Sequence, residues 1–185
     1  MARSVPDRDL LATHHGELKS PWSPLDEGAV ERELGRVVEG LATDLTIEVF
    51  AEFDHYGSGY ASFVDAWFGC RDLSSRGSGD KHVIGLVVLL SRLAPCYCFL
   101  EGQRWWNANR GTSTSYVPSF RGVDALVTDE VIRLATRVEE WLGRQGYVRL
   151  GSQALGRLLP ADVAVPTILG DGVYRAFDAL FHWDD

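Results

Sequence analysis

The stretch Val83-Ile-Gly-Leu-Val-Val-Leu-Leu90 is apolar on both faces that an extended chain would present, which is typical of a strand at the centre of a sheet. A short turn follows, and Cys96 to Glu101 predicts the next strand. Upstream, apolar and polar residues alternate from Leu45 to Phe53, and Tyr60 to Phe68 predicts the return strand of a hairpin. These four strands in chain order predict an antiparallel meander over about 45–101.

Two segments of helical periodicity flank this meander. The first predicts a helix over about 24–41, with Ser23 as its N-cap and Pro24 at its first position. The second predicts a helix over about 128–143, capped by Thr128 and acidic in its first turn. Each has one apolar stripe, and that of the first comprises Val30, Leu34, Val37, Val38 and Leu41.

The remaining sequence completes one domain. Residues 1–20 show no period and predict a loosely ordered arm, while 21–185 contain no linker or repeat. In the tail we expect a short strand at 147–150, a short helix at 152–159 and a last strand at 173–181. The order of helix, strands, helix and strands predicts a single α+β domain with a mostly antiparallel sheet.

Composition excludes several classes of protein. With 45% hydrophobic and 24% charged residues, the 185-residue chain is too apolar for a disordered protein. It lacks an apolar run long enough for a membrane span, and the N-terminal residues lack the apolar core of a secretory signal. Three cysteines are too few for a disulfide framework, which predicts a cytoplasmic protein. A pI near 5.1 argues against direct binding to nucleic acid.

The net charge of −8 is concentrated in one region. Residues 26–54 hold nine carboxylates against two arginines, a local net charge of −7. Glu48 and Glu52 alternate onto one face of the first predicted strand, and Asp54 follows it. Because like charges on one face of a strand cost stability unless they are solvated or countered, we interpret these three as contacts for a basic partner.

Residues 103–122 form the one basic stretch, with three arginines and no acid. We expect a long loop there, and loops of this length in compact domains are often functional. Trp105 and Trp106 cannot place both indoles on one side of an extended backbone, so one ring should be buried and the other exposed or packed beneath the loop. Trp105, Trp106 and Arg110 are therefore the predicted loop contacts with a partner.

Two kinds of catalytic or metal chemistry were weighed. Cys96 and Cys98 with His82 lack a second ligand pair for structural zinc, so we predict that the cysteines are core residues. The alternative function is a small metal-dependent hydrolase or nuclease that uses the carboxylates of Asp65, Glu101 and Asp178. That alternative lacks the lysine and the basic surface typical of nucleases. No cofactor, metal site or catalytic residue is therefore assigned.

Two stretches suggest a family resemblance. Leu90-Ser-Arg-Leu-Ala-Pro95, which leads into an aromatic strand, and the ending 173–185 resemble the immunity proteins of bacterial polymorphic-toxin systems. The resemblance implies a non-enzymatic inhibitor that neutralises a basic toxin domain by occluding its active site. It assigns no functional residue, and homo-oligomerisation stays open.

Overall fold

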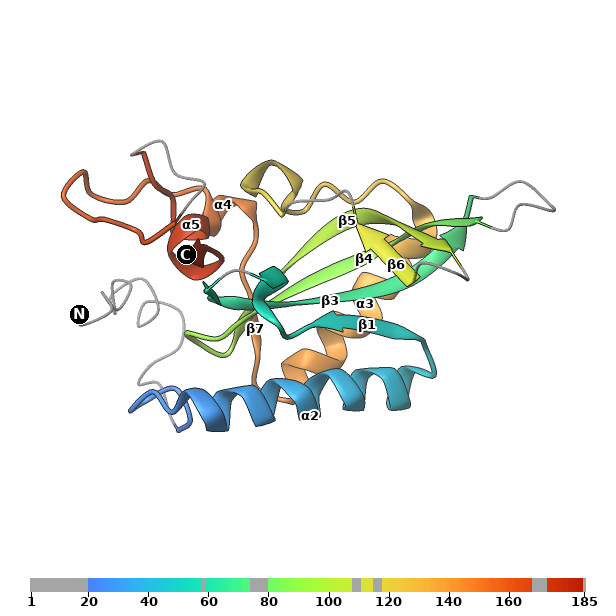
Figure 1. The fold of residues 1–185 in the computed structure, drawn as a ribbon, viewed down its shortest axis with the longest axis horizontal. Coiled ribbons are helices and arrows are strands. Elements are labelled where there is room, and N and C mark those ends of the chain that lie inside the picture. Colours follow the sequence, from blue (N-terminus) through green and yellow to red (C-terminus); the bar gives the residue numbers. More distant parts are fainter. Residues whose placement is uncertain are drawn as a thin grey trace.

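A computed structural model describes residues 20–57, 59–73, 80–107, 111–114, 118–167 and 173–184. Figure 1 shows an α+β fold in which helices pack on a mostly antiparallel sheet, as the sequence predicts. Residues 1–19, which make up nearly all of the predicted arm, lie outside the described residues.

The main sheet confirms the predicted meander. Its order is β1 (Val49–Glu52), β3 (Phe63–Asp72), β4 (Asp80–Ser91), β5 (Cys96–Asn107) and β6 (Gly111–Thr114), each antiparallel to its neighbour. The short strand β7 (Val148–Arg149) runs parallel to β5 at the start of that strand. Because β4 lies at the centre of the sheet and both of its faces are packed, its residues 86–90 are all apolar.

The segment between β1 and β3 is more elaborate than the predicted simple hairpin. A 3-10 turn, η1 (His55–Gly57), leads to β2 (Tyr60–Ala61), which pairs with β8 (Trp183–Asp184) in a separate two-stranded sheet. The Ser62 hydroxyl donates to the carbonyl of Leu180 and accepts the amide of His182. The C-terminus is thereby fastened to the main sheet.

Two long helices cover one face of the sheet, which we call the helix face. Helix α2 (Glu27–Leu45) begins three residues later than predicted, because Asp26 rather than Ser23 accepts the amide of Ala29 as the N-cap. Helix α3 (Asp129–Arg144) follows Thr128, whose position was predicted correctly although its side chain accepts no capping hydrogen bond.

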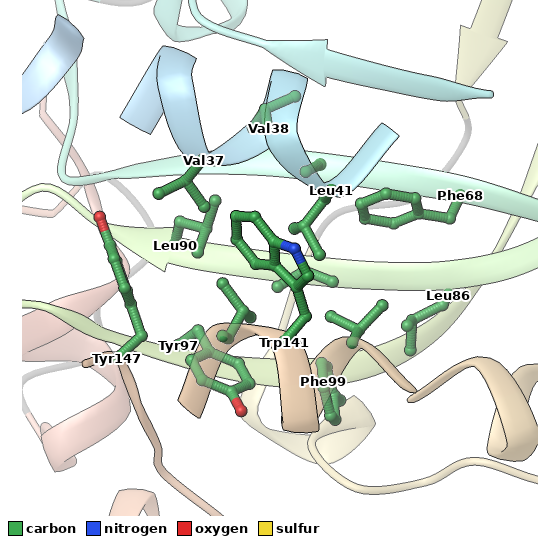
Figure 2. Close-up of a cluster of buried hydrophobic side chains, with 14 of the residues drawn as sticks. Val37, Val38, Leu41, Phe68, Leu86, Leu90, Tyr97, Phe99, Trp141 and Tyr147 are labelled. Atoms are coloured by element: carbon green, nitrogen blue, oxygen red, sulfur yellow. The ribbon is translucent and has the colours of Figure 1, made fainter. Parts of the chain in front are cut away.

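The core on the helix face lies between these helices and strands β3 to β5. Figure 2 shows the Trp141 indole among Val37, Val38 and Leu41 of α2, with Phe99 on the opposite side. The indole Nε1 donates to Asp44 at 2.7 Å, and the ring occupies the space that a side chain at Gly40 would need. The absence of a Cβ at Gly40 therefore lets α2 and α3 approach closely.

A second core lies on the opposite side of the sheet, which we call the C-terminal face. Short elements from the tail pack there: η2 (Phe120–Gly122), α4 (Ser152–Leu155), α5 (Ala176–Leu180) and β8. Figure 1 shows α4 and α5 together near one end of the sheet, where β3 begins. The sheet residues of this core are Phe63, Trp67, Val87, Leu89, Cys96, Cys98 and Leu100.

Two predicted elements are wrong. The predicted loop after residue 103 is instead the continuation of β5 to Asn107 and its hairpin with β6, because cross-strand pairing extends beyond the apolar segment. The predicted last strand over 173–181 contains α5 instead, which Asp178 stabilises by accepting the amide of Arg175. A run of five residues is too short for periodicity to distinguish helix from strand.

Candidate functional site

A row of three glycines crosses the sheet and supports a buried tryptophan. Gly69, Gly85 and Gly102 are register partners on β3, β4 and β5. A Cβ at Gly85 would lie 2.8 Å from the Trp67 ring, and one at Gly69 would lie 3.0 Å from it. The indole therefore lies flat across the glycine row, and its Nε1 donates to the Gly102 carbonyl at 3.4 Å.

A buried ion pair lies on the other side of that indole. The guanidinium of Arg104 is 5.5 Å from the centre of the Trp67 ring and donates to Asp65 at 3.3 Å. Asp65 is only 1% exposed, so its charge requires this partner. The backbone of the glycine row, the Trp67 indole and the Arg104 guanidinium thus form three successive layers. The indole and the carboxylate of Asp65 together hold Arg104 in place.

An open pocket of about 310 Å³ adjoins these layers. No residue of the tail elements lines it, so it lies beyond the part of the C-terminal face that they cover. Its walls combine apolar groups with charges of both signs, and the lining comprises Glu48, Phe50, Trp67, Gly69, Cys70, Arg71, Asp72, Lys81, Val83 and Arg104.

The predicted acidic contacts lie at the edge of this surface. Phe50 on β1 is the register partner of Trp67, and their ring centroids are 5.8 Å apart. Glu52 lies two positions after Phe50 on β1 and therefore on the same face, as predicted. Glu48 immediately precedes β1 and lines the same pocket as Phe50. Glu48 is exposed, Glu52 is half-buried and accepts the amide of Asp54, and Asp54 is exposed.

The acids of α2 contribute less to a binding surface than their number suggests. Glu31 forms an ion pair with the buried Arg92 at 2.9 Å, and Glu33 pairs with Arg36 at 2.7 Å. Asp44 accepts from Trp141. Part of the charge on this helix is thus paired or hydrogen-bonded within the fold, whereas Glu48 and Asp54, on either side of β1, are exposed.

The predicted loop residues do not join the acidic strand in one surface. Trp105 is 48% exposed and stacks on His82, with centroids 4.0 Å and planes 3° apart. Residues an even number of positions apart on a strand share a face, and Trp105 is four positions from Glu101, which contacts the start of α3. Trp105 therefore lies on the helix face. Trp106 lies in β5 with a side chain outside the description, and Arg110 is outside the described residues.

The three carboxylates of the alternative hydrolase do not converge. Asp65 is on the C-terminal face, whereas Glu101 is on the helix face, where it accepts the amides of Val127 and Thr128 and the Thr128 hydroxyl. Partial burial alone would raise the pKa of Glu101, but these hydrogen bonds hold it below its usual value. The Asp178 carboxylate accepts the backbone amide of Arg175 at the start of α5. Each carboxylate therefore has a structural role.

The cysteines are core residues, as predicted. Cys96 and Cys98 are fully buried on the C-terminal face, and burial raises the pKa of Cys96 to about 12 and that of Cys98 well above its ordinary value. His82 is on the other face and accepts or donates a 2.6 Å hydrogen bond with Gln103. Within the described ranges, no group of three or more His, Cys, Asp or Glu side chains is placed to hold a metal ion.

Sequence reasoning missed Trp67, Arg104 and the glycine row. A signal was present, because glycine inside a strand often marks the close approach of another group. Gly85 interrupts the otherwise bulky apolar run of β4, yet its partners on β3 and β5 become identifiable only when the register is known.

Comparison of the chain with protein-family models, curated proteins and solved structures finds no match in any of the three. Among the described residues, no helix has both the length and the apolar character needed to cross a bilayer.

Proposed function

We propose that the protein is a non-enzymatic binding protein that neutralises a basic protein partner. The observation that carries the proposal is the arrangement of Glu48, Phe50 and Glu52 at the edge strand β1, with Phe50 and Glu52 on one face of the strand and Glu48 immediately before it. Two carboxylates flank the aromatic ring, one at each end of the strand, and Asp54 extends the negative charge beyond the strand end.

This arrangement suits a basic partner for two physical reasons. Negative charge concentrated at one edge accelerates encounter with a positive surface and disfavours acidic competitors. An aromatic ring between the charges supplies apolar area that becomes desolvated on contact, and such groups commonly dominate binding energy. Phe50 is anchored beside Trp67, so little side-chain freedom remains to be lost on binding.

The resemblance to immunity proteins suggests which kind of basic protein the partner is. In that role the partner is a bacterial toxin domain that acts on nucleic acid in the cytoplasm. The carboxylates of Glu48, Glu52 and Asp54 would occupy the place of the substrate phosphates and thereby occlude the toxin's active site. Trp105 lies on the other face, so we leave it out of this contact.

A capture experiment with a charge-matched control tests the proposal. The wild-type chain, the E48K/E52K variant and the E39K/E140K variant are immobilised and exposed to lysate from the source organism. Glu39 on α2 and Glu140 on α3 are exposed, so both variants change the net charge equally. We expect one basic protein to be retained by the wild type and by E39K/E140K, but not by E48K/E52K.

Neutralisation is then measured by expressing the captured protein in a bacterial host with each form of the chain. Growth should be restored by the wild type and by E39K/E140K. Equal retention by all three forms would contradict the proposed surface, and toxicity that persists beside the wild-type chain would contradict the inhibitory role.

A further inference from the structure

The outer side of β1 has backbone groups that the fold does not use. β1 is the last strand at its end of the main sheet, and all four of its residues are partly exposed. Within the described ranges, the backbone of residues 49–51 forms hydrogen bonds only with β3. In an antiparallel pair, the N–H and C=O groups of alternate residues point away from the partner strand. These outward groups of β1 are a template for another strand.

The carboxylates next to this edge carry charge that the fold leaves unbalanced. Glu48 and Asp54 are exposed, and neither side chain forms an ion pair or hydrogen bond with another described residue. Glu52 accepts the amide of Asp54 rather than a cationic group in its printed geometry at 2.7 Å. Negative charge thus accompanies the free edge along its whole length.

The pocket of about 310 Å³ opens at the end of β1 where Glu48 lies. Arg104 is neutralised there by its buried carboxylate partner, and Lys81 and Asp72 each already interact with another group of the chain. Arg71 belongs to the helix face, as the register of β3 with β4 requires. Glu48 is therefore the charge on the C-terminal side of the pocket that has no partner among the described residues, and a cationic side chain would complement it.

A second copy of the chain does not suit this edge. Two β1 strands related by a two-fold axis would pair antiparallel. A register centred on Phe50 would place Glu48 of one copy opposite Glu52 of the other, and a register centred on Ala51 would place Glu48 opposite Asp54. Like charges directly opposite each other destabilise a strand pair. The same carboxylates favour a strand with basic residues at those positions.

We propose that the basic partner binds by adding a β-strand to β1. On the C-terminal face this strand alternates basic, apolar and basic residues, with the cationic side chains opposite Glu48 and Glu52 and the apolar one opposite Phe50. Main-chain hydrogen bonds then supply affinity, and the alternating side chains supply selectivity. This inference rests on the proposed function and adds the way in which the partner is held.

Short synthetic strands test the inference without the natural partner. The probe is the fluorescently labelled, C-terminally amidated peptide Thr-Arg-Thr-Val-Thr-Arg-Thr. One control has Glu in place of both Arg residues, and the other, Thr-Thr-Arg-Val-Arg-Thr-Thr, keeps the composition but puts Val and Arg on opposite faces. By fluorescence anisotropy at low salt, the probe should bind the wild-type chain about tenfold more tightly than either control, because cross-strand ion pairs are lost in both.

Absence of probe binding would overturn the proposal, because the carboxylates would then only protect the edge from pairing. Equal binding of the probe and the rearranged control would also overturn it, because attraction by net charge alone would explain both. In sedimentation experiments the wild-type chain should be a monomer. A wild-type dimer that the probe dissociates would make a second copy the occupant of the edge and contradict the proposal.

Amide hydrogen exchange, followed by NMR, distinguishes strand addition from contact through side chains alone. In the free chain, alternate amides of residues 49–52 should exchange rapidly, since they have no partner strand. Saturating probe should slow their exchange several-fold. Bound probe with unchanged exchange at these amides would overturn strand addition.

Charge reversal assigns the positions. The E48K/E52K variant should bind the Glu-containing peptide more tightly than the Arg-containing probe, whereas E39K/E140K should keep the wild-type preference. An unchanged preference in E48K/E52K would overturn the assignment of Glu48 and Glu52.

The peptide and capture experiments fail separately. If E48K/E52K loses the captured protein but the peptides show no selectivity, strand addition is wrong and the binding surface stands. If all three forms of the chain capture equally, the proposed function is wrong whatever the peptides do.

Discussion

The indole ring of Trp67 occupies the space that a side chain at Gly85 would need, across the boundary between two adjacent strands. This relationship places a large aromatic ring parallel to the sheet and brings Arg104 into position above it. Both the candidate pocket and the anchoring of Phe50 depend on the resulting position of the indole.

Substitution of Gly85 by alanine should therefore destabilise the fold. The added methyl group would meet the Trp67 ring and the backbone carbonyl of Phe68, so we expect a loss of about 3 kcal/mol in the free energy of unfolding. Chemical denaturation measures it. Gly35→Ala is the matched control, because nothing lies within 4 Å of its Cβ and alanine favours a helix. A loss at Gly85 no larger than at Gly35 would refute this account of the indole.

Arg92 should be more important to stability than its partner Glu31. Its guanidinium donates to the backbone carbonyls of Ala61, Phe63 and Phe53 as well as to Glu31. Arg92→Met leaves these acceptors without their donor and should lower the free energy of unfolding by about 3 kcal/mol. Glu31→Gln, at a partly exposed site, should cost about 1 kcal/mol. Denaturation curves that show the reverse order would contradict this interpretation.

Glu101 should contribute stability that is lost in acid. Its pKa is lowered in the folded protein by the hydrogen bonds from Thr128 and Val127. The unfolded chain therefore binds this proton more readily, and the contribution is complete above the unfolded pKa of about 4.3 and disappears as the pH falls through the lower folded value. Thermal melts from pH 6 to 3 should fall less steeply for Glu101→Gln than for the wild type. Equal slopes would show that the carboxylate does not stabilise α3.

His182 should produce a separate loss of stability at a higher pH. Burial disfavours the charged imidazolium and lowers the pKa of His182 below its usual value of 6.5. As the pH falls below about 6.5, the unfolded state takes up the proton first, so stability decreases. His182→Gln should reduce the slope of the melting temperature between pH 7 and 5. An unchanged slope would contradict this assignment.

Sequence patterns predicted the elements whose periodicity is long and regular. The stripe from Val30 to Leu41 predicted α2, and the apolar run from Val83 predicted the central strand. The errors lie where short-range signals compete with tertiary contacts. Asp26 replaces Ser23 as the cap of α2, and the tail forms α5 rather than a strand because packing on the sheet determines so short an element.

The candidate site was predictable only in part. The period of a strand predicts that Glu52 shares a face with Phe50, and β1 confirms this, whereas Glu48 lies just before the strand. The pocket depends on register across β3, β4 and β5 and on an arginine that reaches Asp65, 39 residues away in sequence. No local pattern encodes such a relationship. The sequence likewise did not show on which face of the sheet Trp105 lies, because this depends on the continuation of β5 to Asn107.

The most direct test of the proposed function is the association rate of the captured basic partner as a function of ionic strength, measured by stopped flow. For the wild type and E39K/E140K, the rate should fall steeply as salt screens the acidic strand. For E48K/E52K, association should be slower by about tenfold at low salt and nearly independent of salt. Identical rates and salt dependence for E48K/E52K and the wild type would contradict the claim that β1 is the binding surface.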